Sequence, residues 1–157
     1  MISLKALAVG VALATVGCAQ EVIKTGLLQA KSVDLGTVYL YKPQSDGGDP
    51  VWAQLGGEGQ ANQFTLRSDS TISTKGLTLN IMRNQIDEKR LGYSGVITSE
   101  NGWKIVDGNK LVSDGVFYGY QDEFQACRYA GGEYFVYLVS HKADNMECVP
   151  LGALYII

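Results

Sequence analysis

From Gln20 onward, apolar and polar residues alternate with a period of two, and Gly, Asp and Asn interrupt the alternation at short intervals. No window carries an apolar stripe at the spacing of three to four residues that an amphipathic helix requires. This pattern is typical of half-buried strands joined by tight turns. We therefore predict an all-β protein of about a dozen short strands.

The strongest strand signal lies in the last third of the chain, where Tyr134 to Val139 form an unbroken run of aromatic and aliphatic residues. β-Branched and aromatic side chains fit a pleated, half-buried surface better than a helix. We predict a central strand over Tyr134–Ser140 and a charged loop over Asp87–Arg90. The other predicted strands are Leu35–Tyr41, Val51–Leu55, Gln63–Leu66, Gly76–Met82, Gly92–Thr98, Gly102–Val106, Lys110–Val112, Val116–Tyr120, Phe124–Arg128 and a last strand in the tail Val149–Ile157.

The chain also matches itself when it is shifted by 39 positions, which places Phe64-Thr65-Leu66 on Trp103-Lys104-Ile105. The same shift places Ile72 on Leu111 and Thr78 on Phe117, and a third copy would begin near Thr25. Units of this length cannot bury an apolar face alone, so three copies predict a closed, three-fold arrangement. We expect a β-trefoil-like closed architecture, with a two-layer β-sandwich as the alternative.

The N-terminus is expected to be a secretory signal. One positive charge at Lys5 precedes the apolar stretch Ala6–Gly17, and small residues end at Ala19. We predict a signal peptide over residues 1–19 and a single all-β domain over residues 20–157. A cut before Cys18, as in a bacterial lipoprotein, is the alternative and would tether the protein to a membrane, although Thr15 stands where such signals usually have Leu.

Removal of the signal would leave two cysteines, Cys127 and Cys148, on either side of the predicted central strand. An even number of cysteines in an exported chain is typical of disulfide formation. We predict a Cys127–Cys148 disulfide that holds the strand entering the central run to the strand leaving it.

The formal net charge is −3, and the basic residues are scattered along the chain. Nucleic acids and anionic lipids are bound by clustered Lys and Arg. We therefore expect neither nucleic acid nor a membrane as a partner of the domain.

The sequence does not favour an enzyme. His141 is the only histidine, and a triad with Ser140 or Ser113 and Asp144 lacks the Gly-x-Ser-x-Gly elbow of hydrolases. No Cys-x-x-Cys or His-rich spacing predicts a metal, and no cofactor is expected. The carboxylates that a glycosidase would need all lie in predicted loops, at Asp87, Glu88, Asp122, Glu123, Glu133 and Glu147.

Aromatic side chains raise a second function class, because their flat faces stack on sugar rings. Trp52 and Trp103 are the candidates for glycan stacking. Trp103 opens an alternating strand and is better explained as a core residue, whereas Trp52 fits either role. Tyr118, Tyr120, Tyr129 and Tyr155 are expected to be ordinary strand residues.

The C-terminal part of the chain carries an ordered set of residues: Gly102, Trp103, Ile105, Gly108, Asn109, Leu111, Phe117, Tyr118, Cys127, Tyr134, Val136, Tyr137 and Cys148. Phe64-Thr65-Leu66 and Lys89 to Tyr93 precede it. This order, over about Phe64 to Ile157, resembles the C-terminal domain of fungal PIR cell-wall proteins and PhiA-like secreted wall proteins.

The resemblance implies a non-enzymatic, secreted structural protein of the fungal cell wall or extracellular matrix, with β-glucan or other wall proteins as partners. The repeats whose glutamine is linked to β-glucan in that family have no counterpart here, and the additional cysteines of its domain are missing. A secreted glycan- or protein-binding module, such as an effector, is the alternative function, and a small secreted glycoside hydrolase is a third.

Overall fold

The computed structural model describes residues 20–44, 50–83, 89–95, 102–140 and 145–157. The predicted signal peptide, the acidic pair Asp87-Glu88, His141 and Asp144 lie outside the described residues. No helix in these described ranges is long and apolar enough to cross a membrane.

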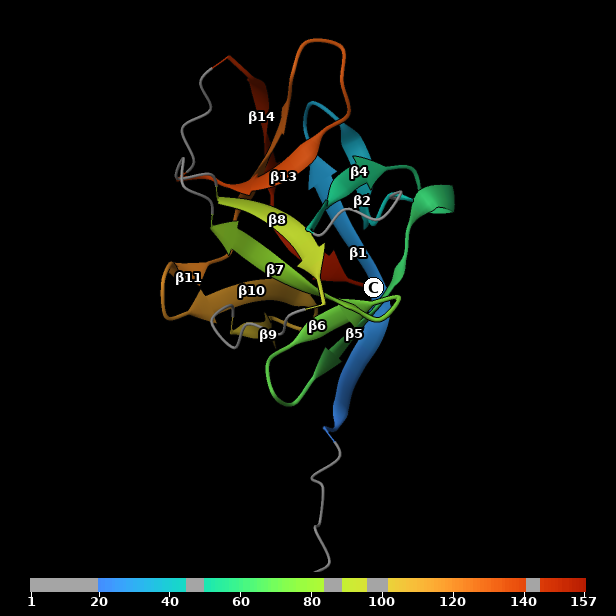
Figure 1. Cartoon of the computed structure of the whole chain (residues 1–157), viewed down its shortest axis with the longest axis vertical. Helices are drawn as coiled ribbons and strands as arrows, with labels where there is room; N and C mark the ends of the chain where they lie inside the picture. Colours follow the sequence, from blue (N-terminus) through green and yellow to red (C-terminus); the bar gives the residue numbers. More distant parts are fainter. Residues whose placement is uncertain (1–19, 45–49, 84–88, 96–101, 141–144) are drawn as a thin grey trace, which may run out of the picture.

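The prediction of an all-β protein is confirmed (Figure 1). The described residues form fifteen strands and one short 3-10 helix, η1 (Glu58–Gln60). The strands are β1 (Val22–Ser32), β2 (Gly36–Tyr41), β3 (Val51–Trp52), β4 (Gln54–Gly56), β5 (Gln63–Arg67), β6 (Ile72–Thr74), β7 (Leu77–Arg83), β8 (Lys89–Ser94), β9 (Trp103–Val106), β10 (Lys110–Gly115), β11 (Gly119–Gln121), β12 (Phe124–Arg128), β13 (Phe135–Leu138), β14 (Glu147–Gly152) and β15 (Leu154–Ile156).

All fifteen strands belong to one antiparallel sheet, and part of this sheet closes into a ring. The ring runs through eight strands in the order β1, β2, β4, β13, β8, β7, β6 and β5, and the pairing of β5 with β1 closes it. Strands β15, β10, β9 and β11 extend the sheet from β1, β12 and β14 extend it from β13, and β3 pairs with β8. The architecture is therefore closed, and the three-fold symmetry of a trefoil stays a prediction.

β1, the longest strand, was not among the predicted strands. Its first half pairs with β5, its second half with β2, and β15 pairs with it at Leu28 and Gln29. Gly26 and the doublet Leu27-Leu28 interrupt its alternation, which hides a strand from a search for period two.

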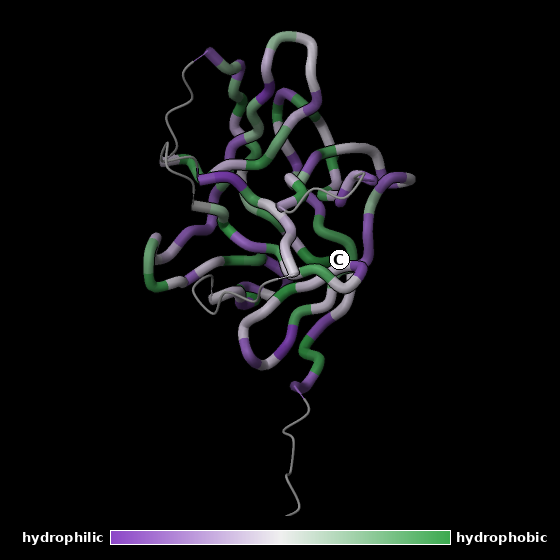
Figure 2. Tube along the Cα trace, viewed as in Figure 1, coloured by the Kyte–Doolittle hydropathy of each residue, from purple (hydrophilic) through white to green (hydrophobic). Residues whose placement is uncertain are grey.

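The buried apolar residues form one core cluster, to which strands of the ring and of its extensions both contribute. Hydrophobic and hydrophilic residues alternate along the strands (Figure 2), as expected where one face of a strand is buried. The buried residues come from almost every strand. They include Leu28, Leu40, Phe64, Leu66, Ile72, Leu79, Leu91, Trp103, Leu111, Val136, Leu138, Leu154 and Ile156.

The internal repeat has a structural counterpart in two places. Both matched segments form a β-hairpin, β5–β6 and β9–β10, and both bury the matched aromatic residue, Phe64 or Trp103. The match ends at Thr78, which lies in β7, because its counterpart Phe117 lies in an exposed turn.

Two predicted strands near the C-terminus have different bounds. The prediction for Val116–Tyr120 was wrong: β10 ends at Gly115, the chain turns, and β11 begins at Gly119, which pairs with Gly115. Gly119 has a φ of 63°, a turn conformation that glycine adopts readily, and Val116 is 87% exposed at the tip. The central strand β13 is also shorter than predicted, because Val139 has left the sheet and is 55% exposed.

The tail and the charged loop were also predicted incorrectly. The tail forms two strands, because Gly152 has a φ of 76° and redirects the chain from β14, which pairs with β12, to β15, which pairs with β1 and β10. Lys89 and Arg90 do not belong to a loop, since β8 begins at Lys89 and pairs with β7 from that residue on.

The predicted disulfide joins Cys127 in β12 to Cys148 in β14. The two residues are direct cross-strand partners, so the bond links adjacent strands, and β13 pairs with the other edge of β12. Among the described strands, β14 pairs only with β12, although the hydroxyl of Ser32 in β1 donates a hydrogen bond of 2.7 Å to the carbonyl of Pro150. The disulfide therefore reinforces the pairing of β14 with β12 by a covalent bond.

Replacement of both cysteines, Cys127→Ala with Cys148→Ala, should lower the free energy of unfolding by about 3 kcal/mol. The bond closes a loop between residues 21 positions apart and so reduces the conformational entropy of the unfolded chain. Urea denaturation followed by circular dichroism measures the change. Reductant should lower the free energy of unfolding of the wild-type protein by a similar amount and should leave that of the double variant unchanged. Equal stability of oxidised and reduced wild type would contradict this role.

Tyr93 on β8 carries a buried phenol. Its side chain is fully buried, its ring stacks on Phe64 with the centroids 6.2 Å apart, and its hydroxyl has no hydrogen-bond partner among the described residues. Burial raises the pKa of Tyr93 well above its ordinary value, because a phenolate there would lose its hydration.

Tyr93 should make the fold sensitive to alkali. Its folded-state pKa exceeds its unfolded-state pKa, so its contribution to stability is complete below about pH 10 and is lost as the pH rises toward the folded-state value. Tyr93→Phe should leave stability at pH 7 nearly unchanged, since no hydrogen bond is lost, and should reduce the decline above pH 10. Urea denaturation at pH 7 to 11 measures both effects, and an unchanged alkaline decline in the variant would refute the assignment.

Candidate functional site

Trp103, one of the two predicted stacking residues, belongs to the core. Its side chain is 1% exposed, and its indole Nε1 donates a hydrogen bond of 2.9 Å to the backbone carbonyl of Leu79. Its role as a glycan-stacking residue is therefore corrected, because neither face of the ring reaches the surface. An aromatic residue at the start of an inward-facing alternation is placed in the core by the same pleat that predicts the strand.

Trp52 lies on β3 and is partly exposed. It pairs across the sheet with Gly92 of β8, and its ring covers that glycine: a Cβ at Gly92 would lie 3.1 Å from the ring and 2.9 Å from the side chain of Met82. Gly92 therefore provides the space in which the indole rests.

The guanidinium of Arg90 lies over the ring of Trp52, with its central carbon 3.6 Å from the ring centroid. The same carbon is 5.2 Å from the ring of Phe135 and 5.5 Å from that of Tyr137. Arg90 and Tyr137 are cross-strand partners on β8 and β13, so the sheet register itself brings the cation to the aromatic residues. We call Trp52, Arg90, Phe135 and Tyr137 the Arg90 cluster.

The aromatic side chains of the Arg90 cluster could in principle stack on a ligand, but they contact the guanidinium of Arg90 instead. A cation over an aromatic face is attracted by the ring quadrupole, and the planar guanidinium also stacks on it. Because Arg90 covers Trp52, we assign this cluster to stabilising the contact between β3, β8 and β13.

Two of the acidic side chains considered for catalysis, Asp122 and Glu147, form ion pairs. The ammonium of Lys110 lies 2.6 Å from Asp122, and Arg128 lies 2.9 Å from Glu147. The hydrogen bond to Asp122 is the main reason that the pKa of Lys110 is raised, and Glu147 raises the pKa of Arg128 in the same way. Glu147 thus joins β14 to β12, and Asp122 joins the connection between β11 and β12 to β10.

The other residues considered for chemistry are dispersed. Ser113 is fully buried on β10, whereas Ser140 is exposed and accepts a hydrogen bond of 3.5 Å from Lys89. No group of three metal-binding side chains occurs among the residues that the structure describes.

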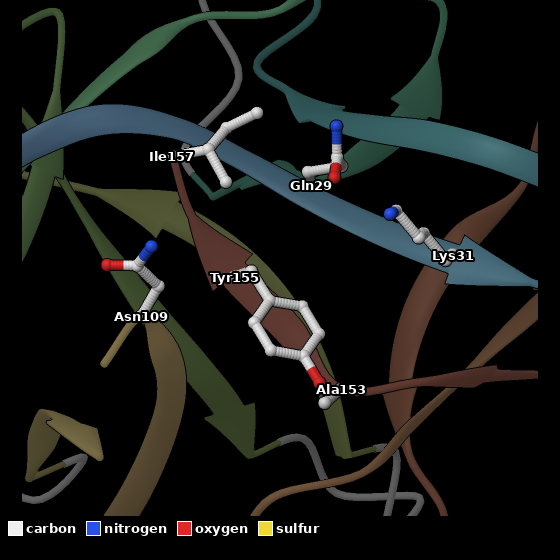
Figure 3. Close-up of a pocket in the computed structure, with 6 residues that line it drawn as sticks. All are labelled: Gln29, Lys31, Asn109, Ala153, Tyr155 and Ile157. Carbon is white, nitrogen blue, oxygen red and sulfur yellow. The ribbon is translucent and has the colours of Figure 1, made fainter. Parts of the chain in front are cut away.

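A surface hollow of about 390 Å³ lies where β1, β15 and the β9–β10 turn meet (Figure 3). We call it the Tyr155 hollow. It is lined by Gln29, Lys31, Asn109, Ala153, Tyr155 and Ile157. Tyr155 is 38% exposed, and its ring lies between Asn109 and the pair Gln29 and Lys31 in Figure 3. This arrangement combines one aromatic face with two amides and one ammonium.

Sequence reasoning missed the Tyr155 hollow because it treated Tyr155 as an ordinary strand residue. The signal was present: Leu154 and Ile156 are apolar neighbours that point into the core, so Tyr155 between them has to point outward. What the pattern could not provide was the identity of the strands beside it.

A second hollow of about 520 Å³ lies beside the disulfide and is lined mainly by apolar side chains, including Phe124, Val139 and Val149. Of its polar residues, Gln125 already donates a hydrogen bond of 3.0 Å to the carbonyl of Leu138. This hollow therefore offers fewer hydrogen-bonding groups than the Tyr155 hollow.

Comparison with protein-family models, with curated proteins and with solved structures finds no match for this chain. Its function is therefore inferred from its own residues: the disulfide, the Arg90 cluster and the Tyr155 hollow.

The contact between Trp52 and Arg90 should appear as a coupling free energy in a double-mutant cycle. Trp52→Leu and Arg90→Met, made singly and together, should be non-additive by about 1 kcal/mol, the size of a partly desolvated cation–π contact. Urea denaturation gives the four free energies. Lys104→Met, which removes an ammonium that pairs with Asp114, serves as the control and should be additive with Trp52→Leu. Additivity of the first pair would refute a direct contact.

Proposed function

We propose that this chain is a non-enzymatic, secreted structural protein of the fungal cell wall or extracellular matrix. The observation that carries the proposal is the Cys127–Cys148 disulfide, because structural disulfides persist in oxidising compartments outside the cytosol. The bond joins β14 to β12, which is the described strand with which β14 pairs.

The resemblance to fungal PIR and PhiA-like wall proteins supports the same role. Its residues fall on consecutive elements of the sheet, and several of them, such as Trp103, Leu111 and Val136, are core residues. The ring is completed by β1, β2 and β4, which precede the segment that carries the resemblance.

The ion pairs of Asp122 and Glu147 support a structural role for these carboxylates. A glycosidase would instead need two carboxyl groups that face a common sugar site.

A secreted binding module is the second candidate function, and a specific observation favours it. The Tyr155 hollow presents an exposed aromatic ring beside amide groups, a combination that can hold a ligand without any reaction. The two functions are compatible, since a wall protein also has to contact the wall.

Fractionation of the producing organism tests the proposal. Walls are washed with salt and detergent, then extracted in turn with reductant, mild alkali and glucanase, and an antibody follows the protein. We expect the protein to remain in the washed walls until one of the last three steps. A cytosolic enzyme followed in the same fractions controls for contamination. Recovery of the protein only from the culture medium would contradict a structural role in the wall.

A further inference from the structure

The Tyr155 hollow is built on paired backbone. Tyr155 is the cross-strand partner of Gln29 on β1 and of Lys110 on β10, and the N–H of Ile156 donates a hydrogen bond of 2.9 Å to the carbonyl of Asn109. Leu27 and Ile157 exchange two backbone hydrogen bonds of 2.9 and 3.0 Å at the other end. The residues that line the hollow are therefore held in place before any ligand arrives, which lowers the entropic cost of binding.

Hydrogen bonds orient both amide side chains. The amide nitrogen of Gln29 donates to the hydroxyl of Tyr39 at 2.9 Å, which leaves the amide oxygen of Gln29 as an acceptor. The ammonium of Lys24 donates to the amide oxygen of Asn109, which leaves the amide nitrogen of Asn109 as a donor. An acceptor and a donor thus stand on opposite sides of the Tyr155 ring (Figure 3).

Lys31 adds a second donor beside Gln29. None of the hydrogen bonds or ion pairs among the described residues involves its ammonium. No carboxylate side chain lines the hollow. Its hydrogen-bonding groups therefore suit a ligand that carries several oxygen atoms, some of which accept and some of which donate.

These features select a class of ligand. A purely apolar ligand would leave the amides and the ammonium without partners, which costs free energy on burial. A pyranose ring matches both the aromatic face and the polar groups of the hollow. One face of the sugar is made of C–H groups that stack on an aromatic ring, and its rim carries hydroxyl groups that form hydrogen bonds. A volume of about 390 Å³ is at the small end for ligand sites and suits one or two sugar rings.

We propose that the Tyr155 hollow binds a pyranose residue of a polysaccharide, which stacks on Tyr155 and forms hydrogen bonds with Gln29, Asn109 and Lys31. The choice of polysaccharide as the ligand rests on the proposed function. The hollow contains neither of the two tryptophans predicted to stack on glycans. Trp103 is buried, and Arg90 covers Trp52.

Binding of the purified protein to neutral oligosaccharides tests this inference. Oligomers of β-1,3-glucan, chitin, mannan and galactan are titrated, and two-dimensional NMR follows the side-chain amide signals of Gln29 and Asn109. At least one oligosaccharide should shift both signals in a saturable way. The absence of any shift at millimolar concentrations of every oligosaccharide would overturn the inference.

Substitutions locate the site. Tyr155→Ala should weaken binding about tenfold through loss of the stacking face, whereas Tyr155→Phe should retain most of it. Tyr120→Ala, which removes another exposed tyrosine on β11 outside the hollow, is the matched control and should bind as the wild type does. Circular dichroism and the urea midpoint verify that each variant folds, and Gln29→Ala replaces Tyr155→Ala if that variant does not fold. Equal losses from Tyr120→Ala and Tyr155→Ala would overturn the assignment.

The binding experiments and the fractionation test separate claims, so one proposal can be wrong while the other holds. A protein that stays in washed walls but binds none of the oligosaccharides would keep the proposed function and lose this inference. A protein that binds through Tyr155 but is never held in walls would keep the inference and favour the binding module.

Discussion

The pairing of β1 with β5 is the contact on which the rest of the structure depends, because it closes the ring of eight strands from which the other strands extend. Gly26 permits this pairing beside β15. A Cβ at Gly26 would lie 2.1 Å from the backbone oxygen of Ile157, and that oxygen accepts a hydrogen bond of 2.9 Å from Leu27. A residue without a side chain thus lets one strand hold β5 and the end of β15 at once.

The same junction produces the outer surface. Leu28 on β1 points into the core, and so do Leu154 and Ile156 on β15. The pleat therefore turns Gln29 and Tyr155 outward as neighbours. The Tyr155 hollow is the outward counterpart of the core contact between β1 and β15, so the two cannot be separated in the fold.

The aromatic residues divide into three roles according to their strands. Trp103 fills the core, Trp52 is covered by Arg90, and Tyr155 keeps an exposed face. The disulfide acts in a different part of the sheet, where β12 is the described strand with which β14 pairs. The disulfide and the candidate binding surface thus lie on different extensions of the ring, one from β13 and one from β1.

The sequence by itself determined the all-β class and the core position of Trp103, because period-two alternation and turn residues are properties of neighbouring positions. It also determined the disulfide, because only two cysteines follow the predicted signal peptide. It did not reveal β1, whose alternation Gly26 interrupts, and it placed Arg90 in a loop. Only the tertiary structure decided which strands are neighbours, and with that the closure of the ring, the cover over Trp52 and the hollow at Tyr155. The physical reason is that cross-strand partners are set by non-local pairing between residues far apart in the chain, such as Gln29 and Tyr155, which no local pattern encodes.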